Sequence, residues 1–346
     1  MSQLHSFYPE IEPYNNGYLK VSDVHQIYYE QIGNPNGRPI LYVHGGGGTN
    51  GCCDKERRFF DPSYYRAILV DRRALGRSKP FGEIKDNDTW KVVEDYEKLR
   101  KFLEIEKWLI FGGSWGSTLT MIYSELYPDR VTGLILRGVT LGQGKDLQWI
   151  YHAGASNILP EFFETYANAI PEAERDDIVM AYWRRINSDD KEVAFRSLIF
   201  VLRSVAVNAY ALKEFTRIKY AKLWTHWGCA LSIIHDHEVD LSMGLDDEVI
   251  YLSARHDNHF AANRGFFSPD KENYVLKHIH KIRHIPCIIV HGRYDVICPV
   301  QRAWDLHKNW PEADLRIIRN AGHTINDIPL ASALIAAIKE FQQKGY

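Results

Sequence analysis

The sequence predicts an α/β protein in which a mostly parallel central sheet is flanked by helices and interrupted by a helical insertion. Three observations predict this fold class. Short apolar runs of the kind buried on both faces of a parallel sheet recur along the chain, helical patterns alternate with them, and one long stretch lacks such runs. With 346 residues, the chain is long enough for one large domain that carries a sizeable insertion.

Strands are expected first near the N-terminus, where polar and apolar residues alternate in two short segments. Residues 18–21 and 25–30 are separated by Ser22-Asp23-Val24 and predict a hairpin. Nearly continuous apolar runs follow and predict buried strands at residues 39–43, 67–71, 107–111, 131–136, 286–291 and 315–318.

Helices are predicted between these strands. Asp88 or Thr89 is expected to cap a helix that extends to about residue 103, and further helices are expected at residues 118–126 and 329–343. Between residues 141 and 267, helical patterns rich in tryptophan replace the buried-strand runs. We therefore expect a core of residues 1–140 and 268–346, and a helical cap of residues 141–267.

Composition excludes several classes of function. The formal net charge is −2, so no basic surplus is present to bind a phosphate backbone, and a nucleic-acid partner is not expected. No apolar stretch of about 18 residues predicts a membrane span, and the first residues do not resemble a secretion signal. We expect a cytoplasmic protein that acts on a small molecule or short peptide, while the oligomeric state stays open.

Metal and disulfide sites are not expected either. Five cysteines form an odd set without paired Cys-x-x-Cys spacing. The segment His235-Asp236-His237-Glu238 has metal-binding side chains, but without a distant third ligand it is more typical of a solvated loop. We therefore predict a protein without a metal or cofactor.

The stretch Gly112-Gly113-Ser114-Trp115-Gly116 indicates a nucleophile elbow. It lies between a predicted strand and a predicted helix, which is the context that a Gly-x-Ser-x-Gly turn requires. The glycines allow neighbouring backbone to pass close to the turn. Ser114 is therefore the candidate nucleophile, although the pattern alone would also fit a glycine-rich turn.

Two further residues complete a catalytic triad in the chain order serine, acid, histidine. Asp295 follows a late predicted strand, and His323 lies in the loop after the last one. This order is that of an α/β-hydrolase, and strand ends are where open α/β sheets place their sites. His323 would take the proton of Ser114, and Asp295 would orient the imidazole. Asp327 is a weaker candidate for the acid because it does not directly follow a strand.

An oxyanion that forms on attack needs backbone N–H donors. The N–H of Trp115, directly after the nucleophile, is one candidate. The second is expected from the loop that follows the first buried strand, where Gly45 and Gly46 belong to a run of four glycines. The alternative for this run is a merely flexible loop.

Together these residues resemble the proline iminopeptidase family of α/β-hydrolases, over most of the chain. The most specific matches are Gly-Gly-Ser-Trp-Gly-Ser-Thr-Leu from residue 112, Asn-Arg-Gly-Phe-Phe from residue 263 and Gly-Arg-Tyr-Asp from residue 292. The resemblance implies cofactor-free hydrolysis after an N-terminal proline. It maps nucleophile, acid and base onto Ser114, Asp295 and His323.

The resemblance also implies a substrate-binding set of Gly45, Asp257, Trp227 and Arg264. Family members hold the substrate's imino cation with two cap glutamates, one in a Trp-Glu pair and one in a Glu-Asn-His segment. Here Gly228 follows Trp227, and the second segment begins with Asp257. Arg72 likewise stands where the family has glutamine.

These departures leave several functions open. The first is a prolyl aminopeptidase in which Asp257 recognises the amine. The second keeps the triad for another small substrate, as an esterase, an amidase or another acyl-transfer enzyme. A catalytically silent binding protein on the same scaffold is the third, and it would have no chemical need for nucleophile, acid, base and oxyanion loop together.

Overall fold

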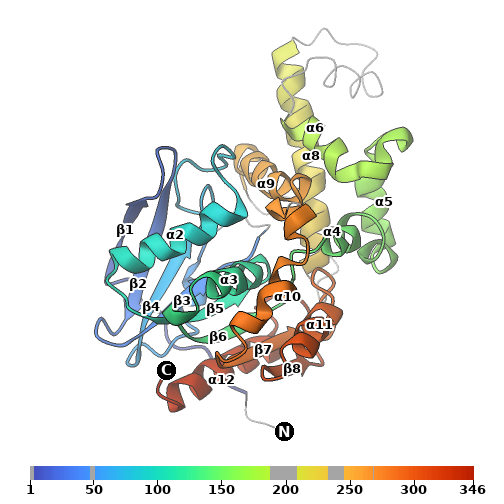
Figure 1. Ribbon diagram of the computed structural model, residues 1–346. Coiled ribbons are helices and arrows are strands. Elements are labelled where there is room, and N and C mark those ends of the chain that lie inside the picture. Colours follow the sequence, from blue (N-terminus) through green and yellow to red (C-terminus); the bar gives the residue numbers. More distant parts are fainter. Residues whose placement is uncertain (1–3, 47–50, 188–208, 233–244, 268) are drawn as a thin grey trace.

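An eight-stranded sheet forms the centre of the protein in the computed structural model, which describes residues 4–46, 51–187, 209–232, 245–267 and 269–346 (Figure 1). The strands are β1 (Asn15–Lys20), β2 (Gln26–Gly33), β3 (Arg38–Val43), β4 (Tyr65–Asp71), β5 (Trp108–Gly113), β6 (Val131–Arg137), β7 (Cys287–Gly292) and β8 (Asp314–Ile318). Their order across the sheet is β1-β2-β4-β3-β5-β6-β7-β8. β1 and β2 pair antiparallel, as do β2 and β4, and the remaining pairs are parallel. The predicted mostly parallel sheet is confirmed.

The direction in which the chain builds the sheet reverses at β3. From β3 the chain adds β4 on one side, and it then returns to place β5 on the other side of β3. In open α/β sheets, such a reversal leaves a crevice at the carboxyl ends of the two strands, and ligands bind there. The loops after β3 and β5 are therefore the first place to look for a site.

Helices cover both faces of the sheet because its central strands bury side chains on both sides. The helices outside the predicted cap are α1 (Asp54–Arg57), α2 (Thr89–Phe102), α3 (Trp115–Leu126), α10 (Tyr274–His278), α11 (Gln301–Asn309) and α12 (Ile328–Gln343). Apolar residues of α2, α3, α10 and α11 share one buried cluster with the sheet, and those of α12 share the other. Burial on both faces explains why the parallel strands have continuous apolar sequences.

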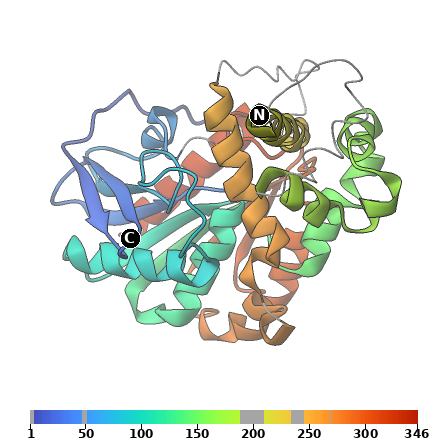
Figure 2. The same ribbon diagram turned by 90° about the horizontal axis from the view of Figure 1, so that it is seen from above.

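The segment from residue 141 to 267 contains helices and no strand among its described residues. Its helices are α4 (Gly144–Tyr151), α5 (Pro160–Asn168), α6 (Ile178–Asn187), α8 (Ala209–Ser232) and α9 (Asp247–Ala262). They form a separate aromatic cluster in which Tyr166 stacks on Tyr182, with ring centres 4.5 Å apart. In Figures 1 and 2 they lie together beside the sheet. The exact domain boundaries stay a prediction, and the segment His235 to Glu238 lies outside the described residues.

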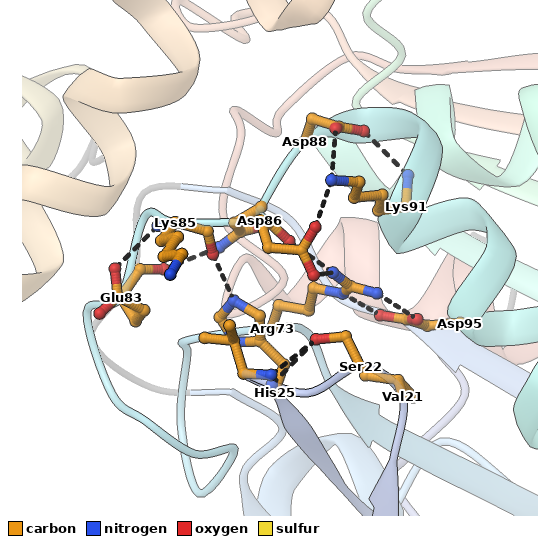
Figure 3. A network of polar contacts seen from close by, with 12 residues as sticks. Val21, Ser22, His25, Arg73, Glu83, Lys85, Asp86, Asp88, Lys91 and Asp95 are labelled. Atoms are coloured by element: carbon orange, nitrogen blue, oxygen red, sulfur yellow. Dashed lines mark hydrogen bonds and ion pairs between the residues drawn. The ribbon is translucent and has the colours of Figure 1, made fainter.

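A buried ion-pair network fixes the loop that leads from β4 to α2 (Figure 3). Arg73 binds both carboxylate oxygens of Asp95 on α2, and it also binds the carbonyl and carboxylate of Asp86. Asp88 caps α2 by accepting the N–H groups of Trp90 and Lys91, each at 2.9 Å. These contacts hold the backbone that follows Arg72, the residue next to Arg73.

Candidate active site

Ser114 occupies a strained turn between β5 and α3. Its backbone has φ 57° and ψ −128°, a conformation that costs an L-residue about 1–3 kcal/mol and that persists only where the surroundings impose it. The N–H of Ser114 donates to the carbonyl of Arg137 at 2.8 Å, and its carbonyl accepts the N–H and hydroxyl of Ser117. The turn is thus held from both sides, with the serine at the carboxyl end of a central strand.

The glycines of the elbow are needed for close packing. A Cβ at Gly112 would lie 2.3 Å from the Thr120 hydroxyl oxygen, and one at Gly116 would lie 2.2 Å from the carbonyl oxygen of Val43. Both distances are far shorter than a carbon–oxygen contact allows. The glycines therefore let the elbow helix pack against the end of β3, which places the loop after β3 beside Ser114.

His323 and Asp295 form a hydrogen-bonded pair at the neighbouring strand ends. The imidazole Nδ1 lies 2.8 and 3.0 Å from the two carboxylate oxygens of Asp295, which in turn accepts the N–H of Cys298 at 2.7 Å. Burial opposes ionisation of Asp295, but His323 and the Cys298 N–H outweigh it and lower the pKa of the carboxyl. The acid therefore stays ionised and can keep the proton on Nδ1, which leaves Nε2 as a base.

Asp327, the alternative acid, binds elsewhere. Its carboxylate accepts the N–H of Gly322 at 2.6 Å, so it holds the loop that carries His323. Arg137 also anchors this loop, because its Nη1 donates to the carbonyl of His323 at 2.9 Å. The same Nη1 lies 3.3 Å from Nε2 of the His323 imidazole. The orientation of His323 is thus set by a carboxylate on one side and a guanidinium on the other.

A cavity of about 420 Å³ joins these groups to the helices of the predicted cap. Ser114, Trp115, Cys298 and His323 line it from the sheet side, and residues of α4, α8 and α9 line it from the other side. A volume of this size accommodates a small organic molecule or about one to two amino-acid residues. The predicted nucleophile and base therefore line the same cavity.

The loop after β3 presents Gly46 to this cavity. The carbonyl of Gly45 accepts the Arg72 guanidinium at 2.7 Å and lies 2.9 Å from His44 Nδ1. His44 Nε2 accepts the N–H of Arg72, so its proton is on Nδ1, and burial lowers the pKa of His44 to about 3. Because the C=O and the next N–H of a trans peptide point in opposite directions, the Gly46 N–H points away from Arg72.

Three of the predicted substrate-binding residues lie in this loop or at the cavity. Asp257 lines the cavity, and its Oδ2 accepts the indole N–H of Trp224 at 2.9 Å. Arg264 is exposed and lines the cavity, while Gly45 packs so close to Ser114 that a Cβ there would lie 2.9 Å from the serine Cβ. Trp227, in contrast, is buried among the cap aromatics and donates to the carbonyl of Ile150.

Trp227 is not among the residues that line the cavity, so a direct contact with substrate is not supported by its position. Its neighbour Gly228 does line the cavity, and a Cβ there would meet no atom within 4 Å. The place where the resemblance led us to expect a glutamate is therefore open cavity space.

One group of side chains among the described residues could hold a metal ion. Asp295, Cys298 and His323 bring their donor atoms within 4.8 Å of one another. Two of these groups are already bonded to each other, so an acid–base pair accounts for the arrangement. None of the helices described is both long enough and apolar enough to cross a membrane.

The fold and this site together define the protein class. The family model of the alpha/beta hydrolase fold matches residues 38–328, and the solved esterase from Exiguobacterium antarcticum has the same fold. That structure aligns with a TM-score of 0.54 and 16% identity over 94% of this chain and 98% of its own. The predicted fold class is confirmed.

Curated sequences identify the family more closely. A proline iminopeptidase of Arabidopsis thaliana is 43% identical over 96% of this chain and 81% of its own. One of Xanthomonas citri is 43% identical over 98% of this chain and 100% of its own. The chain belongs to the proline iminopeptidase family of α/β-hydrolases, as the sequence resemblance predicts.

Sequence reasoning missed several polar residues at the site. Arg137 ends β6, His291 lies near the end of β7, and Cys298 follows Asp295 closely, so each is at a strand end or in a loop near the triad. Their position at strand ends, or in a loop that follows one, is the signal in the sequence that could have identified them. In the sequence, Arg72 stands out only as a departure from the family, because its place in the cavity wall depends on tertiary packing.

Proposed function

We propose that this protein releases an N-terminal proline from short peptides or amides through a Ser114, His323 and Asp295 triad. The observation that carries the proposal is the convergence of the strained Ser114 and the His323–Asp295 pair on one cavity. The near full-length similarity to proline iminopeptidases supports the choice of substrate.

In the first half of the reaction, the Ser114 hydroxyl oxygen attacks the prolyl carbonyl carbon, and His323 Nε2 takes the hydroxyl proton. Asp295 stabilises the imidazolium that results because its carboxylate lies 2.8 Å from Nδ1. The oxyanion would be held by the backbone N–H groups of Trp115 and Gly46. His323 then protonates the leaving amine, the carbon–nitrogen bond breaks, and a prolyl ester of Ser114 remains.

In the second half, water replaces the leaving amine. His323 removes a proton from the water, the hydroxide adds to the ester carbonyl, and the ester bond breaks as the imidazolium returns its proton to Ser114. Proline leaves, and the enzyme is restored. No redox step or external cofactor enters this balance.

Asp257 is our candidate for recognition of the substrate imino group. Its carboxylate lines the cavity, and the Trp224 indole fixes one of its oxygens. A residue at Gly46 would bring its Cβ within 3.9 Å of Asp257 Oδ1, so the carboxylate lies next to the oxyanion loop. The amine of a short acyl group could therefore reach it while the carbonyl lies at Ser114.

A second function is favoured by the open space at Gly228. One of the two carboxylates that the family resemblance predicts is absent there, and a small uncharged acyl group would lose less from this absence than a cationic one. The alternative proposal is an esterase, amidase or other acyl-transfer enzyme for a small non-peptide substrate. It uses the same triad and differs only in the acyl group.

The organisation around this activity is also a proposal. Residues 141–267 would act as a cap domain that encloses the substrate against residues 1–140 and 268–346. Location in the cytoplasm would fit a small peptide substrate.

The test is kcat/KM for proline 4-nitroanilide and for 4-nitrophenyl acetate, each with the native protein, Ser114→Ala and Ser124→Ala. Ser124 lies on α3, the helix that begins directly after Ser114, and donates its hydroxyl to the carbonyl of Thr120, which makes it a matched control. We expect loss of both activities in Ser114→Ala alone, and a strong preference of the native protein for the proline amide.

Turnover of the ester alone, still dependent on Ser114, would favour the alternative acyl-transfer function. Proline release that survives Ser114→Ala would remove the proposed mechanism. Native protein without either activity, and without reaction of Ser114 with a fluorophosphonate, would leave the silent binding protein.

A further inference from the structure

Arg72 is a buried cation at the cavity wall without a carboxylate in direct contact. The residue is 2% exposed and lines the cavity together with Ser114 and Asp257. Its only side-chain hydrogen bond in the described part of the protein runs from Nη2 to the carbonyl of Gly45 at 2.7 Å. Nε is enclosed without an acceptor, and no ion pair joins Arg72 to a described acidic residue within 4 Å.

Several other buried arginines of the described residues are neutralised directly, whereas Arg137 also lacks a carboxylate partner but donates to the His323 carbonyl and does not line the cavity. Arg73, the residue after Arg72, holds both oxygens of Asp95, and Arg57 holds both oxygens of Glu30. A buried guanidinium without such a partner is destabilising unless an anion or several acceptors satisfy it. The contrast between the adjacent Arg72 and Arg73 suggests that Arg72 has its partner in the cavity contents.

The surroundings of Arg72 place this partner near the reacting centre. Gly45, which accepts the guanidinium, packs directly against Ser114. Asp257, on α9, lies next to Gly46 of that loop, and its carboxylate lines the same cavity as Arg72. Arg72 and Asp257 thus lie against the same loop, so a group that binds Arg72 would belong to the same acyl half of the substrate as the amine proposed for Asp257.

We propose that Arg72 binds a carboxylate in the acyl half of the substrate, so that the cavity accepts an amino-terminal residue with an acidic side chain. The guanidinium would hold the carboxylate, and Asp257 would hold the amino group. This inference rests on the proposed acyl transfer at Ser114, and it does not require that proline be the preferred residue.

A purely structural role for Arg72 makes a different prediction. If the guanidinium served only to hold the Gly45 carbonyl, its removal would disturb the oxyanion loop and slow every substrate by a similar factor. A role in binding a carboxylate would instead change the ratio between an acidic substrate and its uncharged isostere. This ratio separates the two roles.

The experiment compares kcat/KM for the 4-nitroanilides of L-glutamate and L-glutamine, which differ in charge and hardly in shape. It uses the native protein, Arg72→Gln, Arg72→Lys and Arg264→Gln. Arg264→Gln removes the exposed cavity cation and thus tests whether a different positive charge is responsible. Thermal unfolding shows whether each variant is folded, and proline 4-nitroanilide reports on acyl transfer itself.

We expect the native protein to prefer the glutamate amide by about thirtyfold or more, the lower end for loss of one partner from a buried charge pair. Arg72→Gln should bring the ratio close to one, Arg72→Lys should keep part of it, and Arg264→Gln should keep it. A native ratio near or below one would overturn the inference, as would a ratio that survives Arg72→Gln or disappears in Arg264→Gln.

The remaining outcomes also decide. Hydrolysis of the proline amide with no hydrolysis of either the glutamate or the glutamine amide would overturn the inference while the proposed function stands. An equal loss for both substrates in Arg72→Gln would assign Arg72 to the oxyanion loop alone. If Ser114 neither reacts with a fluorophosphonate nor supports turnover of any amide, the proposed function fails, and the inference fails with it.

Discussion

Replacing Gly228 by glutamate tests whether the cavity was built for a cationic amine. Gly228 lies on α8 one helical turn after Trp224, whose indole binds Asp257, so a side chain at 228 projects from the same helix face. Its Cβ would meet no atom within 4 Å, and the residue lines the cavity. The new carboxylate can therefore enter the cavity without moving the protein.

The expected gain follows from elementary electrostatics. A carboxylate about 5 Å from a substrate cation attracts it by about 3 kcal/mol at an effective dielectric constant of about 20. Ordering of the new side chain and screening reduce this to roughly 2 kcal/mol, which is about thirtyfold in kcat/KM. Removing a helix-interior glycine should also stabilise the fold by about 0.5–1 kcal/mol.

The assay is kcat/KM for proline 4-nitroanilide with the native protein, Gly228→Glu and Gly228→Gln, beside 4-nitrophenyl acetate as an uncharged substrate. The glutamine variant fills the same space and gains the same helix propensity without the charge. We expect a gain in Gly228→Glu for the proline amide only. If both variants behave alike on the amide while both become more stable, the electrostatic account of this position is wrong.

Three further predictions concern the elbow, the oxyanion loop and stability in acid. Ser114→Gly and Ser114→Ala should both abolish turnover. In denaturant unfolding, Ser114→Gly should be more stable than Ser114→Ala by about 1 kcal/mol or more, because glycine adopts φ 57° without strain. Equal stability of the two variants would show that the turn is not strained. Gly45→Ala should lower kcat/KM at least about tenfold more than Gly46→Ala. A Cβ at Gly45 would lie 2.9 Å from the Ser114 Cβ, whereas the nearest contact of a Cβ at Gly46 would be the Trp115 Cβ at 3.4 Å. The reverse order of the two effects would contradict the placement of this loop. Burial lowers the pKa of His44 to about 3, so the unfolded chain binds more protons than the folded protein between that pH and about 6.5, and stability falls as the pH falls through this window. Between pH 7 and pH 5, we expect His44 to account for about 2 kcal/mol of the lost unfolding free energy. Urea titration of His44→Gln should therefore show a smaller loss of unfolding free energy over this pH range than the native protein. An unchanged pH dependence would contradict the assignment.

Much of the fold could be predicted because its signals are local. The parallel strands are recognisable in the sequence as continuous apolar runs. Asp88 caps the helix that the sequence predicts to begin there. The elbow helix begins at Trp115, three residues before the predicted start, because the apolar periodicity that marks a helix becomes visible only after the glycine-rich turn. Helix α11 was not predicted at all.

The candidate site was predictable in part for the same reason. Ser114, Asp295 and His323 each follow a strand, so their positions in the sequence already place them at one edge of a parallel sheet. Which side chains line the cavity depends instead on how the segment of residues 141–267 packs over that edge. Trp227 turned out to lie in an aromatic core, whereas Arg72 lies at the cavity wall.

Labelling with a fluorophosphonate followed by peptide mapping tests the central claim, that Ser114 is the nucleophile of a site that binds an amino-terminal proline. We predict that the label is found on the peptide containing Ser114, that prolinamide slows its appearance, and that acetamide at the same concentration does not. Labelling of a different residue would contradict the account, as would hydrolysis of proline amides by a protein whose Ser114 stays unlabelled.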